Sequence, residues 1–93
     1  VYIIIYQYIY MSICGYNLRM LNKKEVYKII GRNIRNARKA KGLTQEDFAE
    51  LMDKSWSYIA KLETGTQNFS IGKLIDIAEF LDIELEQLLN INI

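Results

Sequence analysis

Residues 43–65 read LTQEDFAELMDKSWSYIAKLETG, and this stretch decides the fold. Apolar residues recur in it at helical spacing, in two runs separated by a short polar break. Thr44 with Asp47 three residues later is a capping-box signal, Ser55 is a second N-cap signal, and Gly65 is a stop signal. The stretch therefore predicts two helices of roughly eight to ten residues, joined by a turn of about three residues.

A turn this short does not let the two helices lie antiparallel, so they are expected to cross steeply. Ala49 supplies the small side chain that a close crossing needs, and Ile59 and Leu62 face inward from the second helix of the pair. A helix held in this way can enter the major groove and present its outer side chains to base edges. That outer face comprises Trp56, Ser57, Ala60, Lys61 and Thr64.

The flanking sequence predicts further helices. A helical period begins near Lys23 and ends at Lys41-Gly42, where Gly42 suits a left-handed backbone. Ser70 caps another helix, and a short final helix is expected near residues 84–89. The predicted fold class is all-α: a compact five-helix bundle with a helix-turn-helix at its second and third helices. Residues 23–93 form this domain, and residues 1–22 form an apolar N-terminal extension.

The first part of the extension, residues 1–18, is uncharged and rich in Ile and Tyr. Alternation over residues 2–11 favours an extended conformation. Three interpretations stay open. The segment is upstream sequence included by a wrong start or a disordered tail, since Met20 precedes the first helix; it is a β arm that pairs with another chain; or it is a membrane anchor.

Charge is unevenly distributed along the chain. Residues 19–41 contain nine Lys or Arg and one acid, whereas residues 42–93 contain three Lys and ten acids, although the net charge is only +1. A basic block beside an acidic body suits contact with a polyanion on one side. The same charges could equally serve only to solvate a helix face, so charge alone leaves both interpretations open.

Composition argues against several classes of site. Histidine is absent and Cys14 is the single cysteine, so a Cys/His zinc cluster, an internal disulfide and a histidine-based triad are excluded. No glycine-rich phosphate loop or paired-acid signature is present. We therefore expect no enzyme, no metal site and no cofactor.

The ordered set of residues from Ile34 and Arg38 to Leu88 resembles the Cro/XRE, or phage-repressor type, helix-turn-helix DNA-binding family. The resemblance covers about 60 of the 93 residues. Asp53 departs from the pattern because it occupies the position where the turn usually has glycine; aspartate tolerates a left-handed backbone at some cost. The residues that carry the resemblance are Gly42-Leu43-Thr44-Gln45, Ala49, Ser55-Trp56-Ser57-Tyr58-Ile59, Leu62-Glu63-Thr64-Gly65, Asn68-Phe69-Ser70-Ile71, Leu74, Ile77-Ala78, Leu81 and Leu88.

The resemblance implies a role for each matching position. Gln45 corresponds to a phosphate-contacting glutamine, and Arg38 with Glu63 corresponds to a structural ion pair. Trp56 falls on a base-reading position, but the residue itself leaves two interpretations: contact with a sugar or thymine methyl, or cover for the core. The expected DNA-binding set is Gln45, Ser55, Trp56, Ser57, Ala60, Lys61, Thr64 and Asn68.

The function implied is a sequence-specific, cytoplasmic transcriptional regulator that binds double-stranded DNA. The apolar C-terminal residues Ile83, Leu85, Leu88, Leu89, Ile91 and Ile93 exceed what one small domain obviously covers, which favours a homodimer; the alternative is that they belong to the monomer core. Two other functions remain open within the family: an antitoxin that sequesters a toxin protein, and a restriction–modification controller. Binding to a membrane is not expected.

Overall fold

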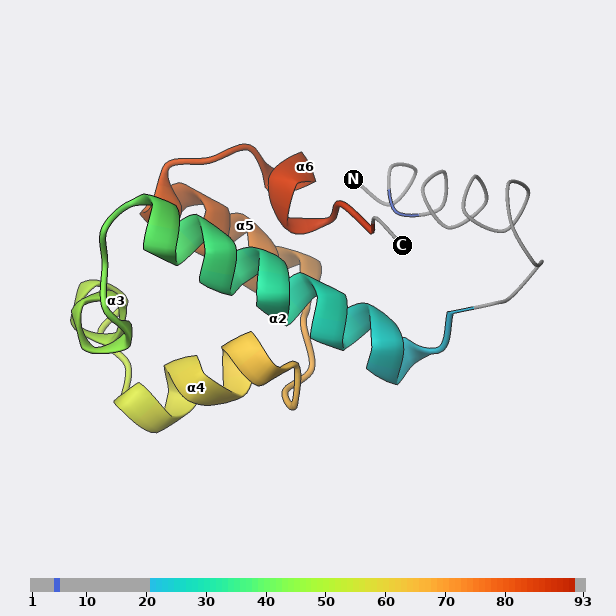
Figure 1. Ribbon diagram of the computed structural model, residues 1–93, viewed down its shortest axis with the longest axis horizontal. Coiled ribbons are helices and arrows are strands. Elements are labelled where there is room, and N and C mark those ends of the chain that lie inside the picture. The colour runs from blue at the N-terminus through green and yellow to red at the C-terminus, as the bar shows by residue number, and fades with distance from the viewer. Residues whose placement is uncertain (1–4, 6–20, 92–93) are drawn as a thin grey trace.

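The computed structural model describes Ile5 and residues 21–91, and in residues 21–91 the regular structure is entirely helical. This confirms the all-α, five-helix prediction. The helices are drawn in Figure 1 as α2 (Lys23–Ala40), α3 (Gln45–Leu51), α4 (Trp56–Thr64), α5 (Ile71–Leu81) and α6 (Leu85–Leu88).

The four longer helices begin at capping side chains, as the sequence signals predict for three of them. Asn22, Thr44, Ser55 and Ser70 each have extended backbone, and the side chain of each accepts a hydrogen bond from the backbone N–H three residues later. These bonds satisfy N–H groups that have no partner inside the helix. The start of each helix is therefore fixed locally by one polar residue.

The same four helices end at a residue with a left-handed backbone. Gly42, Asp53, Gly65 and Asp82 have φ between 53° and 74°. After α3, the N–H of Asp53 donates to the Glu50 carbonyl and that of Lys54 to the Ala49 carbonyl, which is a Schellman pair. The left-handed conformation expected of Asp53 is thus confirmed. Because this motif begins at Met52, α3 spans seven residues, fewer than predicted.

The helices pack around α2. Figure 1 shows α2 in the middle, with α4 on one side of it and α5 and α6 on the other. In this view α3 is seen end-on while α4 runs across the picture, so the predicted steep crossing of these two helices is confirmed. The core combines residues of α2 to α6, and its fully buried large side chains are Ile34, Phe48, Ile59, Leu62, Leu74, Ile77, Leu81, Leu88 and Leu89.

The C-terminal apolar segment belongs to this core. Leu88, Leu89 and Ile91 are at most 2% exposed, and Ile83 and Leu85 are partly buried against the core. The Asn33 side chain of α2 donates to the carbonyls of Leu88 and Asn90, both at 2.9 Å, and so ties the segment to the bundle. The argument for a dimer from these residues is therefore wrong, because one domain does cover them. Ile93 lies outside the described residues.

The predictions for the N-terminal extension fall almost entirely outside the described residues. Ile5 is the exception: it is helical, partly buried and packed against the core. The extended conformation predicted for residues 2–11 is thus wrong at Ile5, where packing outweighs the weak preference of a β-branched residue for strands. The interpretations as tail, β arm or membrane anchor concern residues that the structure does not describe.

Candidate nucleic-acid interface

Helix α4 has two faces with opposite surroundings. Ile59, Leu62 and Glu63 point inward and are buried, with Glu63 at 7% exposure. The side chains predicted to form the outer face lie as expected: Trp56, Ser57, Lys61 and Thr64 are exposed, and Ala60 is partly buried. The outer face therefore presents polar and aromatic groups from a helix whose opposite face is fixed in the core.

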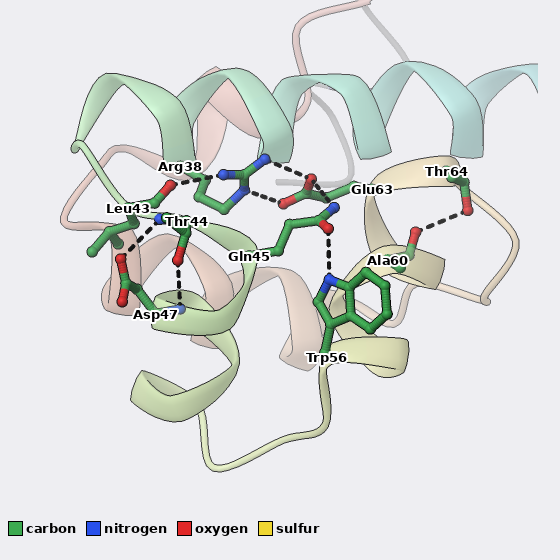
Figure 2. Close-up of polar contacts among 9 residues, drawn as sticks. All are labelled: Arg38, Leu43, Thr44, Gln45, Asp47, Trp56, Ala60, Glu63 and Thr64. Carbon is green, nitrogen blue, oxygen red and sulfur yellow. Dashed lines mark hydrogen bonds and ion pairs between the residues drawn. The ribbon is translucent and has the colours of Figure 1, made fainter.

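The buried ion pair predicted between Arg38 and Glu63 is present. Arg38 Nε lies 2.6 Å from Glu63 Oε2, and Nη2 donates to Oε1 at 3.1 Å. The remaining arm of the guanidinium donates to the Leu43 carbonyl at 2.7 Å. The pair links α2 to α4 and to the loop before α3 (Figure 2), so its role is structural. A buried charge is tolerated when it is paired and hydrogen-bonded in this way.

Gln45 extends this network toward solvent. Its amide nitrogen donates to Glu63 Oε1 at 3.1 Å, and its amide oxygen accepts from the Trp56 indole N–H at 2.8 Å. Figure 2 shows the resulting chain of contacts running from Arg38 through Glu63 and Gln45 to Trp56. Its oxygen is occupied by the indole, and the second N–H of the amide has no partner among the described residues, so Gln45 can donate to an anion.

Trp56 lies on the surface. Its side chain is 57% exposed, so the interpretation that it covers the core is wrong. Position explains this: Trp56 is the first residue of α4, directly after the turn, so its side chain lies at the exposed end of the helix. No local pattern indicates its hydrogen bond to Gln45, because the bond joins residues 11 positions apart in different helices.

The start of α3 holds Gln45 in place. The Thr44 hydroxyl accepts from the Asp47 N–H, and the Asp47 carboxylate accepts from the Thr44 N–H, both at 3.0 Å. This reciprocal pair is the predicted capping box. The backbone hydrogen bond from Thr44 above all, and the contact with its side chain, keep the pKa of Asp47 below its ordinary value. The carboxylate therefore stays charged at the helix N-terminus, where negative charge is stabilising.

The far end of α4 carries the remaining predicted residues. The Thr64 hydroxyl donates to the Ala60 carbonyl at 3.0 Å, and α4 ends at Gly65. Asn68 is exposed in the following loop, and its carbonyl accepts from the Lys73 ammonium at 3.3 Å. Thr64 and Asn68 are thus exposed beside the C-terminal end of α4, whereas Gln45 lies beside its N-terminal end. The predicted set spans the length of the helix.

Sequence reasoning missed Gly31 of α2. A Cβ at this position would lie 2.6 Å from the Glu63 carbonyl oxygen and 2.7 Å from that of Leu62, so the backbones of α2 and α4 touch there. Helix α4 can approach this closely only because residue 31 has no side chain. An isolated glycine inside a helical pattern was the available signal.

The described part of the chain contains neither a cluster suited to a metal ion nor a helix suited to spanning a membrane. No group of three or more His, Cys, Asp or Glu residues there is placed to hold a metal ion. None of the helices described has the length and apolarity required to span a bilayer.

Comparison with known proteins identifies the architecture. A family model described as helix-turn-helix matches residues 34–88, more than half of the chain. The chain belongs to the Cro/XRE helix-turn-helix family. The matched range contains Arg38, Gln45, Trp56 and Glu63, so the whole network described above lies within the family domain.

The similar curated proteins are named as helix-turn-helix transcriptional regulators. One from Rickettsia conorii is 33% identical over 63 residues, which is 68% of this chain and 50% of that protein. YazB of Bacillus subtilis is 39% identical over 61 residues, or 66% of this chain and 88% of YazB. The helix-turn-helix chain thus spans about half the length of the Rickettsia relatives that it matches.

Two solved structures have the same fold. The restriction-modification controller protein C.AhdI from Aeromonas hydrophila is 37% identical, with a TM-score of 0.61; the match covers 67% of this chain and 94% of C.AhdI. A hypothetical transcription factor, NHTF from Neisseria, is 22% identical, with a TM-score of 0.64, and covers 76% of this chain and 82% of NHTF. At that identity, the second match supports the fold alone.

Proposed function

We propose that this helix-turn-helix protein is a transcriptional regulator that binds a specific duplex sequence by inserting α4 into the major groove. The observation that carries the proposal is the outer face of α4, which is exposed along its length while the inner face is anchored by Ile59, Leu62 and the Arg38–Glu63 pair. An exposed helix on a rigid support can present side chains to base edges without reorganisation.

Each outer residue has a role that its chemistry supports. Lys61 donates to guanine O6 or N7, and the Ser57 hydroxyl donates to or accepts from either base of a pair. Trp56 contacts a sugar or a thymine methyl group, and Ala60 allows close approach of the helix. Ser55 lies at the start of α4, where it adjoins the bound DNA, and its hydroxyl accepts a hydrogen bond from the Tyr58 N–H.

Contacts to the sugar-phosphate backbone of the DNA position α4. Gln45 donates its free amide N–H to a phosphate at the N-terminal end of α4, and Thr64 and Asn68 contact the backbone at the other end. Such contacts fix the register on the duplex and carry no sequence information themselves.

We further propose that two copies bind a two-fold symmetric operator. Lys54 and Lys61 are the cations in residues 54–64, so one copy is expected to bind weakly, and two linked copies bind far more tightly. Ile71 and Ile75, one turn apart on α5, are 37% and 40% exposed and offer an apolar surface for the second copy. Sedimentation that gives a monomer at tens of micromolar, with and without operator DNA, would exclude the dimer.

Selection of binding sites from random duplex DNA tests the function. Wild-type protein should enrich one sequence, Lys61→Ala should shift the preferred base at one position, and Gln45→Ala should weaken all sequences alike. An equal loss on every sequence for Lys61→Ala would contradict base reading by this lysine. No enrichment by the wild-type protein would contradict sequence-specific binding.

A restriction–modification controller is the second candidate. It is supported by the 37% identity to C.AhdI over nearly the whole of that protein. It predicts that the selected sequence lies in front of restriction–modification genes in the source genome. An antitoxin would instead co-purify with a small toxin protein, and such a complex would contradict the controller assignment.

A further inference from the structure

The outward face of α2 carries cations that the site described above does not use. Positions 24, 28, 32, 35 and 39 recur at helical spacing and fall within an arc of about 80° on the helix surface. All five side chains are exposed, and they extend along about 22 Å of helix. Five of the nine cations of the basic block therefore form a single stripe, made up of Lys24, Lys28, Arg32, Arg35 and Lys39.

One end of this stripe adjoins the C-terminal end of α4. Lys24, Lys28 and residues 64–68, which comprise the last residue of α4 and the loop after it, line a common surface depression of about 450 Å³, which we term the lysine ledge. The two segments touch through their backbones: a Cβ at Gly65 would lie 2.7 Å from the Cα of Lys28. The side chain of Lys28 therefore begins next to the end of α4, where Thr64 is exposed.

Aromatic contacts brace the ledge. The rings of Tyr27 and Phe69 meet edge to face, with 5.4 Å between their centroids, and so connect α2 to the loop after α4. Lys23 lies over the Tyr27 ring, 5.7 Å from its centroid. Lys24 and Lys28 are exposed beside this cluster, and their flexible stems can follow a bound phosphate.

The ledge keeps its positive charge. Residues 21–28 and 60–70 contain only two acids, Glu25 and Glu63. Glu63 is buried and neutralised by Arg38, and in residues 21–28 Glu25 is outnumbered by Lys23, Lys24 and Lys28. The lysines therefore present a positive potential at the end of the helix that is proposed to enter the groove.

We propose that Lys24 and Lys28 bind the sugar-phosphate backbone of the same duplex, outside the base pairs that α4 reads. The lysine ledge then lies along the same DNA strand that Thr64 and Asn68 contact. This proposal rests on the proposed function, and it explains how a recognition helix with few cations gains affinity. Each phosphate contact adds about 0.9 to the slope of log K against log salt concentration for duplex DNA.

The test measures this salt slope for Lys28→Gln and for the double variant Lys24→Gln/Lys28→Gln. Lys41→Gln is the matched control. Lys41 is also an exposed lysine, at the C-terminal end of α2, but its ammonium lies 3.4 Å from the Asp82 carbonyl and so points away from the lysine ledge. Each variant is titrated on the selected sequence in a short duplex and in one extended by about five base pairs, half a helical turn, on each side.

On the extended duplex, the slope per bound chain should fall by about 0.9 for Lys28→Gln and by about 1.8 for the double variant, and it should stay unchanged for Lys41→Gln. On the short duplex the differences between the variants should vanish. Equal slopes for Lys28→Gln and Lys41→Gln on the extended duplex would overturn the proposed phosphate contacts of the lysine ledge and leave the proposed function standing. Failure of the wild-type protein to bind any duplex would overturn the proposed function and the ledge with it. Equal melting temperatures of the variants establish that folding is unchanged.

Discussion

The two faces of α4 differ in almost every respect, although they belong to the same nine residues. The inner face is held by apolar packing, by an ion pair and by direct backbone contact with Gly31. Within the described residues the outer face has few partners outside α4: the Trp56 indole donates to Gln45, and the Thr64 hydroxyl contacts that of Thr66. The difference shows that the stabilising contacts lie on the inner face, where they hold the helix in position, and that the outer side chains are left available for a partner. Substitutions on the two faces should therefore have separable effects.

The largest effect is expected from breaking the inner ion pair. Glu63→Ala leaves the Arg38 guanidinium buried without its counter-charge, which should lower the free energy of unfolding by about 3–5 kcal/mol. Chemical denaturation measures this loss. Replacing both residues with apolar ones, as in Arg38→Met/Glu63→Leu, should cost less than Glu63→Ala. A single variant within about 1 kcal/mol of wild type would show that the pair is not essential to the inner face.

The next effect concerns the backbone contact between α2 and α4. Gly31→Ala places a methyl group within 3 Å of backbone atoms of Leu62 and Glu63, so the helices must separate, at about 1–3 kcal/mol. Gly72→Ala in α5 is the control, because nothing lies within 4 Å of its added Cβ and alanine favours helices by about 0.5–1 kcal/mol. Opposite shifts in melting temperature are expected. A stabilising Gly31→Ala would contradict the close contact.

The helices could be predicted from the sequence because their ends are encoded locally. Thr44, Ser55 and Ser70 cap the helices that follow them, and Gly42 and Gly65 adopt the left-handed backbone that stops a helix. The pairing of Arg38 with Glu63 was available only through the family resemblance, since residues 25 positions apart carry no local signal of contact.

Features that depend on tertiary packing could not be predicted in the same way. The apolar pattern of residues 83–91 is the same whether these side chains cover their own core or a second copy, and the structure places them in their own core. Trp56 posed a similar problem, because a large aromatic residue suits both a core and a binding surface. Gly31 carries meaning only once α4 is known to lie against it.

A smaller effect is expected where the two faces are connected. Trp56→Phe retains an aromatic ring but removes the N–H that holds the Gln45 oxygen, so Gln45 loses its fixed orientation. Loss of this hydrogen bond should weaken binding to all duplexes by about 0.5–1.5 kcal/mol, or about two- to tenfold. Stability should change little because the side chain is exposed. In a Gln45→Ala background, Trp56→Phe should weaken binding less than it does in the wild-type protein. If fluorescence anisotropy shows that the two changes in binding free energy are fully additive, the coupling is contradicted.

The smallest effect concerns pH. The folded-state pKa of Asp47 lies below its ordinary value, so its contribution to stability is present above the unfolded pKa of about 4 and is lost as pH falls through the folded value. Asp47→Asn should therefore reduce the fall in melting temperature between pH 5 and pH 2.5, relative to wild type. Identical pH profiles would show that the capping carboxylate contributes nothing measurable.

Quenching of Trp56 fluorescence tests the central claim, that the outer face of α4 enters the groove. Trp56 is the only tryptophan in the chain, and it is 57% exposed in the free protein. Addition of the selected duplex should shield it from acrylamide, with the same midpoint as binding measured by anisotropy. If anisotropy reports binding while Trp56 remains as accessible to acrylamide as in the free protein, the duplex lies on another face and the account is contradicted.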